Sequence, residues 1–360
     1  MKILPVLCGS LLLAAACGSP VAAQRLVYQQ GDSLYSVAED GKDPRKLFSI
    51  GAASGTLWSA SPDGRRIVWL TRAAAGSPES AVTGLADRPA TVRLSDLTGR
   101  RQKRLFSTDR LKDRQNRAVT LVGVPLSSGG GTGTGSLAEW EPVSLSWSAD
   151  SRTLYVSCFF LPNPAAKAMF AVDAATGIAV IDGDGRWKSI APVTYAEARG
   201  GLIVGSGFAR YRPESGGSPL NYSPLVAVNL IEGARNALYT AESGLAELPD
   251  YAFASAPALA PENRAIVFTA NQRALFLTDK FGKSYRKLFD GNALRPRWSA
   301  DGKAVLCLLP RPLTGQKAVF DLYRIPLPDS AWESEEVAPV SPTTFTLIVQ
   351  GVDWFDTVAE

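Results

Sequence analysis

Short apolar runs separated by tight-turn sequences recur along the chain. The clearest copies share one pattern, in which a turn rich in Pro, Asp, Gly or Asn precedes a nearly continuous apolar run. These copies lie at residues 61–70 (SPDGRRIVWL), 147–156 (WSADSRTLYV), 259–268 (LAPENRAIVF) and 298–307 (WSADGKAVLC). Pro and Asp favour a tight reversal of the backbone, so each copy predicts a turn that enters a strand. The apolar runs do not alternate, which predicts strands that are covered on both faces.

A second element recurs further along each repeat and consists of basic residues followed by Leu-Phe. Its copies lie at residues 45–49, 103–107 and 286–290, each after a Gly-centred turn. That turn follows an alternating strand, as at residues 33–37 and 274–278. The whole unit therefore predicts four antiparallel strands, which is the blade of a β-propeller. No helical periodicity longer than about two turns interrupts the pattern.

The units predict an all-β fold, a six-bladed β-propeller of four-stranded antiparallel blades. The complete blades are expected at residues 56–107, 143–192, 193–242, 251–290 and 294–340. Residues 26–49 supply only three strands, and residues 351–355 are expected to complete this first blade and close the ring, because a ring buries the blade faces and removes a free sheet edge. Seven blades remain an alternative, since residues 193–242 lack a clear Pro-Asp turn.

The amino-terminal segment predicts export. Lys2 precedes an apolar run at residues 3–16, which is shorter than the about 20 residues that span a bilayer and typical of a secretory signal. Two cleavage routes fit: removal of residues 1–23, or a lipoprotein signal over residues 1–16 with Cys17 as the lipid anchor. Both place the protein outside the cytoplasm, in the periplasm or anchored to a membrane. Residues 24–360 would then form one propeller domain with an insertion at residues 108–142.

Composition narrows the classes of function. The chain has no histidine, which excludes His-dependent nucleophiles and His-ligated metals. Its net charge of +4 is too small to predict nucleic-acid binding. No motif predicts a catalytic residue, a cofactor or a metal. Two of the four cysteines lie in or next to the signal, and the apolar neighbours of Cys158 and Cys307 predict small buried side chains.

The repeats also place polar and aromatic side chains at fixed positions. Asp63, Asp150 and Asp301 lie in strand-joining turns, where a carboxylate is expected to accept backbone N–H groups rather than serve as an acid or base. Trp147 and Trp298 share one repeat position. We expect them to pack between blades, with a platform for sugar stacking as the alternative.

Three further segments have a structural interpretation and a functional one. Asp182 and Asp184 have the spacing that begins a calcium loop but lack its distal Glu, so a hairpin turn is expected rather than a cation site. The basic residues at 100–117 predict a solvated edge strand and a mobile insertion, with contact to an anionic surface as the alternative. The glycine-rich residues 127–135 lack the Gly-Lys-Ser/Thr of a phosphate loop and predict a flexible loop.

The first strands of propeller blades line the central channel. Strand alternation places Arg295 and Arg297 there in one blade, Ser144 and Ser146 in another, and Leu57 and Ser59 in a third. Two cations among hydroxyls predict a binding site for an anionic or carbonyl-rich group such as a peptide end. A channel filled by water and salt bridges is the alternative.

The turns at residues 61–64 and 296–302, together with the Leu-Phe strands, resemble the repeats of TolB-like propellers, a branch of WD-type propellers found in bacterial envelopes. The resemblance covers about residues 25–356. It implies a stand-alone propeller outside the cytoplasm that binds a ligand. Because a rigid ring with variable loops is a good binding platform, we expect a monomeric, non-catalytic protein that binds a protein or peptide partner in the envelope and no nucleic acid. A carbohydrate-active enzyme with paired carboxylates, acting as a glycoside hydrolase or lyase, and a ligand-binding sensor are the alternatives.

Overall fold

The computed structural model describes most of the chain that the repeats cover. The described residues are 24–51, 57–72, 90–108, 110–123, 133–136, 140–180, 194–199, 202–207, 209–211, 220–222, 224–229, 235–239, 253–261, 263–282, 285–311, 319–327 and 339–359. The predicted export segment with Cys17, the turn with Asp182 and Asp184, and residues 127–132 of the glycine-rich run lie outside them.

The described chain folds into four-stranded antiparallel sheets whose strands follow one another in sequence. Three of these sheets are β4–β7 (Trp58–Ala60, Arg66–Arg72, Ala90–Asp96, Lys103–Ser107), β10–β13 (Trp140–Trp147, Thr153–Phe160, Asn163–Asp173, Ala179–Val180) and β20–β23 (Ala254–Leu259, Ala265–Ala270, Ala274–Asp279, Tyr285–Asp290). A fourth is β24–β27 (Leu294–Trp298, Ala304–Arg311, Val319–Pro326, Thr346–Val349). A 3-10 turn at Pro342–Thr344 is the helical structure among the described residues.

One sheet contains an element that the repeats did not predict. Strands β14 (Thr194–Arg199), β15 (Leu202–Ser206), β18 (Leu225–Asn229) and β19 (Arg235–Tyr239) form the sheet. The hairpin β16–β17 (Ala209–Tyr211, Leu220–Tyr222) is inserted between its second and third strands. This sheet lies where the Pro-Asp turn is missing from the sequence, and its first two strands pair nonetheless.

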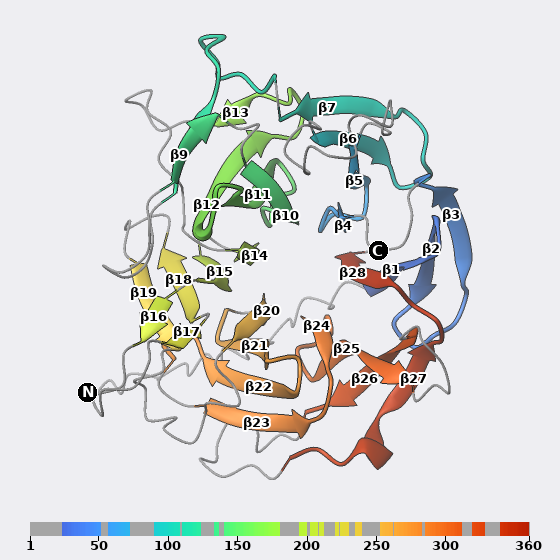
Figure 1. The fold of residues 1–360 in the computed structure, drawn as a ribbon. Coiled ribbons are helices and arrows are strands. Elements are labelled where there is room, and N and C mark those ends of the chain that lie inside the picture. The colour runs from blue at the N-terminus through green and yellow to red at the C-terminus, as the bar shows by residue number, and fades with distance from the viewer. Residues whose placement is uncertain are drawn as a thin grey trace, which may run out of the picture.

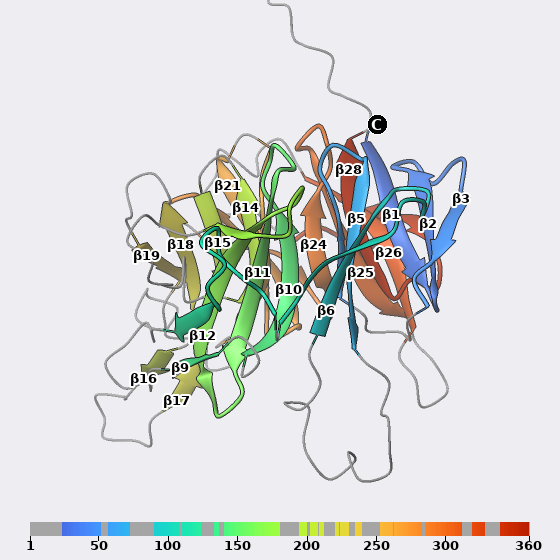
Figure 2. The ribbon, with the colours of Figure 1, turned by 90° about the horizontal axis from the view of Figure 1, so that it is seen from above.

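The carboxyl-terminal strand completes the first sheet, as predicted. Strand β28 (Trp354–Ala359) pairs antiparallel with β1 (Gln24–Gln30), with Trp354 opposite Gln29. Strands β2 (Ser33–Ala38) and β3 (Arg45–Ser49) follow on the other side of β1. The innermost strands β4, β10, β14, β20, β24 and β28 each contact the next, and β28 contacts β4, so the sheets are arranged as a ring (Figures 1 and 2).

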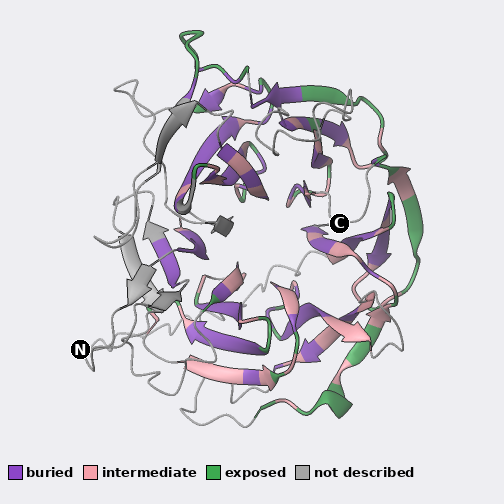
Figure 3. Ribbon diagram, viewed as in Figure 1, coloured by how far each residue is buried: buried purple, intermediate pink, exposed green. Residues whose placement is uncertain are grey.

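The core lies between neighbouring sheets, which explains the apolar runs that do not alternate. In β21, Ile266 and Phe268 pack in a cluster with β15 and β18, whereas Val267 packs on the other face against β25. Each hydrophobic cluster joins two adjacent sheets in this way. Buried residues therefore fill the inner strands, and exposed residues gather on outer strands such as β3 and β7 (Figure 3). A blade cannot bury both faces alone, so the ring is the stable arrangement.

The recurrent turns share one hydrogen-bond pattern, which is the structural role expected for the three aspartates. Asp301 Oδ1 accepts from Ser299 Oγ at 2.6 Å and from Lys303 N at 2.9 Å, while Ser299 Oγ accepts from Ala304 N at 2.9 Å. Asp63 and Asp150 make the same pair of contacts. Burial tends to raise the pKa of Asp301, but the donors from Ser299 and Lys303 outweigh it and lower that pKa below its ordinary value.

The repeated tryptophans join neighbouring blades, as predicted. Trp298 Nε1 donates to the Ala258 carbonyl in the preceding sheet at 2.9 Å, and Trp147 Nε1 donates to the Ser59 carbonyl at 3.3 Å. Both indoles are buried, with 4% of their surface exposed. The alternative of a sugar platform is wrong for these two residues, because a buried ring offers no face to a ligand.

The predicted insertion is partly packed against the ring. Leu111 and Val119 are buried in the cluster between β4–β7 and β10–β13, so this part is more ordered than the mobile segment that we expected. Residues Gly133–Ser136 of the glycine-rich region form β9, which pairs with β8 (Thr120–Gly123), because backbone groups pair without help from side chains. Strand β10 starts at Trp140, inside the segment assigned to the insertion.

The two cysteines of the ring are free and buried, as predicted. Cys158 and Cys307 have no exposed surface, and burial raises the pKa of both thiols. They act as small apolar side chains.

Candidate functional site

The inner strands β24, β20 and β14 each carry a bulge next to the centre of the ring, and those of β24 and β20 share one backbone feature. In β24 the register with β25 shifts between Leu294 and Arg297, and in β20 the register with β21 shifts between Ser255 and Ala258. Each of these two bulges contains a residue with positive φ followed by proline: Arg295 (52°) and Ala256 (48°). A bulge reorients the side chain that it carries. Arg295 and Ala256 thus occupy equivalent places in neighbouring blades, and both line one cavity.

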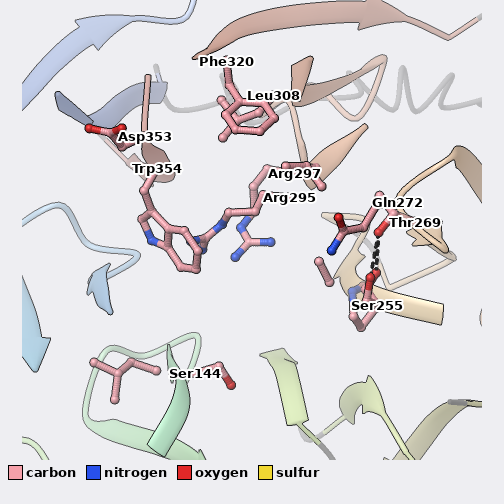
Figure 4. A pocket seen from close by; sticks show the side chains of 14 residues that line it. Ser144, Ser255, Thr269, Gln272, Arg295, Arg297, Leu308, Phe320, Asp353 and Trp354 are labelled. Atoms are coloured by element: carbon pink, nitrogen blue, oxygen red, sulfur yellow. Dashed lines mark hydrogen bonds between the residues drawn. The ribbon is translucent and has the colours of Figure 1, made fainter. Parts of the chain in front are cut away.

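This cavity, of about 400 Å³, is bounded by β10, β20, β21, β24, β25, β26, β28 and adjacent turns (Figure 4). Its polar lining consists of Ser144, Ser255, Thr269, Gln272, Arg295, Arg297 and Asp353. Its apolar lining consists of Leu145, Ala256, Pro257, Leu294, Leu308, Phe320 and Trp354. A concave, mostly apolar site with a few polar groups is the usual form of a ligand pocket.

The cavity brings together three of the six residues that the sequence placed in the channel, and Leu57, Ser59 and Ser146 do not line it. Arg295, Arg297 and Ser144 line it, although they come from strands about 150 residues apart in the chain. Ser146 lies two positions further along β10, is half-buried and is not among the lining residues. The cavity therefore occupies one stretch of the channel rather than its whole length.

Arg297 is held by an ion pair across the ring. Its Nε lies 3.5 Å from Asp356 Oδ1 on β28, and its Nη1 donates to the Pro296 carbonyl at 3.0 Å. Asp356 Oδ2 accepts from Ser59 Oγ on β4 at 2.8 Å and from Ala60 N at 3.2 Å. The Asp356 carboxylate thus connects β28 with β24 and β4. For Arg297, this ion pair agrees with the alternative interpretation, in which salt bridges fill the channel.

Arg295 contacts an aromatic ring and has no ion pair like that of Arg297 among the described residues. Its guanidinium lies over the ring of Trp354, and its Nη1 is enclosed without a hydrogen-bond partner among the described residues. Burial, followed by the neighbouring charge of Arg297, lowers the pKa of Arg295 well below its ordinary value. Ser144 Oγ is likewise enclosed, with no partner in the described part of the chain. A buried polar group without a partner is costly, and such groups mark places where a ligand can bind.

The sequence did not identify several lining residues. Trp354 and Asp353 were assigned only to the closing segment, and Gln272 lies in the turn between β21 and β22. The sequence carried one signal for this region: Ala256-Pro257 and Arg295-Pro296 occupy corresponding positions in two repeats.

Asp353 is the one carboxylate among the described residues of the lining. It accepts from Gly31 N at 2.7 Å and points away from the two arginines (Figure 4). No group of three or more His, Cys, Asp or Glu side chains suited to a metal ion occurs within the described ranges. None of the helical structure described here is long and apolar enough to cross a membrane.

The basic segment lies apart from the cavity, in the turn before the outer strand β7, on β7 itself and in the loop that follows it. Arg100, Arg101, Lys103 and Arg104 are exposed, as expected for an edge strand. In the loop, Arg117 Nε pairs with Asp113 Oδ2 at 2.6 Å.

Comparisons with known proteins find only distant structural similarity. No protein-family model matches the chain, and no curated protein matches it. Among solved structures, the β-propeller domain of the Trilobed protease from Pyrococcus furiosus is 11% identical over 91% of this chain and 86% of that one, with a TM-score of 0.44. A putative 6-phosphogluconolactonase from Bacteroides uniformis is 9% identical over 94% of this chain and 100% of that one, with a TM-score of 0.44. The propeller domain of Swd1 from Myceliophteria thermophila is 13% identical over 91% and 75%, with a TM-score of 0.41.

The class of the protein follows from its own strand order. Four-stranded antiparallel sheets arranged around a centre, with the first sheet completed by the last strand, define a β-propeller. Likenesses at this level of identity and TM-score carry no argument about substrate or reaction.

Proposed function

We propose that this protein is a six-bladed, TolB-like β-propeller that acts outside the cytoplasm as a non-catalytic scaffold for a protein or peptide partner. The observation that carries the proposal is the cavity at the centre of the ring, where Arg295 faces an open volume of about 400 Å³. Rigid inner strands hold this site, and a rigid platform lowers the entropic cost of binding. The four-stranded sheets, taken in chain order, support the count of six.

The chemistry of the cavity favours binding over catalysis. Glycoside hydrolysis needs two carboxyl groups on either side of one bond. The described lining contains one carboxyl group, that of Asp353, and it already accepts a hydrogen bond from Gly31 N. The lining is otherwise composed of hydroxyl, amide, guanidinium and apolar groups, which select a ligand but do not supply an acid and a base.

Capture of partners from cell-envelope extracts by the mature chain tests the proposal. Gln272 is an exposed lining residue, so Gln272→Trp should fill the cavity without disturbing the core. Asn116→Trp is the matched control, because Asn116 is exposed on the loop that follows β7 and shares the positive φ of Gln272 (62° and 57°). We expect the parent and Asn116→Trp to retain an identified partner that Gln272→Trp loses by at least tenfold in affinity. Equal affinity of all three proteins for that partner would refute binding through the cavity.

The location of the protein is tested separately. Mass spectrometry of the mature amino terminus should find either Gln24 as the first residue or a lipid-modified Cys17. An intact Met1 on protein recovered from the cytoplasm would contradict the proposed export.

A further inference from the structure

We propose that the cavity binds a carboxylate group attached to an apolar body, and that Arg295 is the residue that recognises the carboxylate. This inference rests on the proposed binding function, because it names the ligand chemistry of the same site.

The first argument is the balance of charge around the two arginines. Asp356 is the carboxylate that faces them. It forms an ion pair with Arg297 and accepts hydrogen bonds from Ser59 Oγ and Ala60 N. Asp353 is turned away and bound to Gly31 N. Arg295 is therefore a cation whose charge no ion pair balances within the described residues. One unbalanced positive charge matches a singly charged anion.

The second argument is the surroundings of that charge. Ser144 Oγ, which also has no partner among the described residues, lies on the opposite side of the cavity from Arg295 in Figure 4. Apolar side chains, including Leu308, Phe320 and Trp354, cover much of the remaining wall. A carboxylate can receive two parallel hydrogen bonds from a guanidinium, while the apolar wall favours a hydrocarbon group beside it. A free peptide carboxyl terminus with an apolar last residue and a fatty acid share this chemistry.

The third argument comes from the equivalent bulge in the neighbouring blade. Arg295 has a φ of 52° and Ala256 has a φ of 48°, and each precedes proline. The bulge therefore accepts alanine, and the fold does not need a guanidinium at this position. The equivalence also means that Arg295→Ala reproduces a residue that the same chain already carries in the same conformation.

Titration calorimetry with two pairs of probes tests the inference. The probes are N-acetyl-leucyl-phenylalanine and its carboxyl-terminal amide, and decanoate and decanamide. The proteins are the mature parent, Arg295→Ala and the control Arg101→Ala, whose arginine has a φ of 55° but lies exposed in the turn between β6 and β7. Thermal unfolding of each protein verifies that it is folded.

At least one carboxylate should bind the parent and Arg101→Ala with similar affinity. The affinity of the parent for the corresponding amide, and of Arg295→Ala for the carboxylate, should each be lower by about tenfold to a hundredfold. Binding of the peptide acid alone assigns the ligand to peptides, and binding of decanoate alone assigns it to fatty acids. The inference is overturned if no carboxylate binds the folded parent, if acid and amide bind equally, or if Arg295→Ala binds as the parent does. Retention of an envelope partner by Arg295→Ala would preserve the proposed scaffold function while the carboxylate site fails.

Discussion

The indole of Trp298 donates its N–H to the carbonyl of Ala258, which lies on the innermost strand of the preceding blade, at 2.9 Å. Trp147 repeats this relationship with Ser59 at 3.3 Å. In both contacts the donor points backwards along the ring, so each fixes one blade against the one before it. A propeller depends on such contacts between blades, because its strands pair only within a blade.

Replacement of Trp298 by phenylalanine should weaken the contact between these two blades. The variant keeps an aromatic ring but leaves the Ala258 carbonyl without its donor, so we expect a loss of about 1–3 kcal/mol in the free energy of unfolding. Trp147→Phe should lose less, since its hydrogen bond is longer. Urea unfolding followed by circular dichroism measures both, with Phe281→Ala, which is 63% exposed, as a nearly neutral control. Equal stability of Trp298→Phe and the parent would contradict the role of the hydrogen bond.

Arg297 and Asp356 should show energetic coupling. Removal of Asp356 alone leaves a half-buried Arg297 without its counter-ion and Ser59 without its acceptor, so Asp356→Ala should cost about 3–5 kcal/mol. The double-mutant cycle of Arg297→Ala with Asp356→Ala should give a coupling energy of about 0.5–3 kcal/mol. The same cycle with the exposed Arg104→Ala should be additive. A coupling energy of zero for Arg297 would show that the 3.5 Å contact has no energetic weight.

Removal of the closing strand should open the ring. A chain that ends at Gly351 lacks β28, so β1 becomes a free sheet edge and the clusters lose Phe355 and Val358. We expect a broad unfolding transition and association, measured by calorimetry and size-exclusion chromatography. A synthetic peptide of residues 352–360 should restore a monomer with a cooperative transition. A truncated chain that stays monomeric with an unchanged midpoint would show that β28 does not close the ring.

Lys167 should make the free energy of unfolding depend on pH in the alkaline range. Burial lowers the pKa of Lys167 from 10.5 to about 8, while its Nζ donates to the Gly207 carbonyl at 3.0 Å. Between pH 8 and 10.5 the folded state has released a proton that the unfolded state still binds, so this residue's contribution to stability rises with pH over that window. Below pH 8 both states are protonated and the burial penalty is constant.

The measurement for Lys167 is the difference in unfolding free energy between the parent and Lys167→Met from pH 7 to 10. Any advantage of Lys167→Met should shrink as the pH rises above 8, because the parent escapes its burial penalty. A difference that is independent of pH would show that Lys167 titrates normally in the folded state.

The local elements were predictable because their signals are local. The Pro-Asp turns, the Leu-Phe outer strands and the apolar second strands each depend on residues within about ten positions of one another. Closure by β28 was also predictable, because residues 26–49 supplied three strands and the last apolar segment had no other partner. The hairpin β16–β17 and the packed insertion were not, since their partners lie outside the repeat pattern.

For the site, alternation along β24 predicted that Arg295 and Arg297 face the centre of the ring, and both line the cavity there. By itself, the sequence determined the strands, their order and the residue types that face the channel, because these follow from turn chemistry and strand periodicity. Only the tertiary structure decided that Arg297 is neutralised by Asp356 while Arg295 faces an open cavity. The physical reason is that a bulge and a blade-to-blade contact set which charges meet, and both depend on strands far apart in the chain.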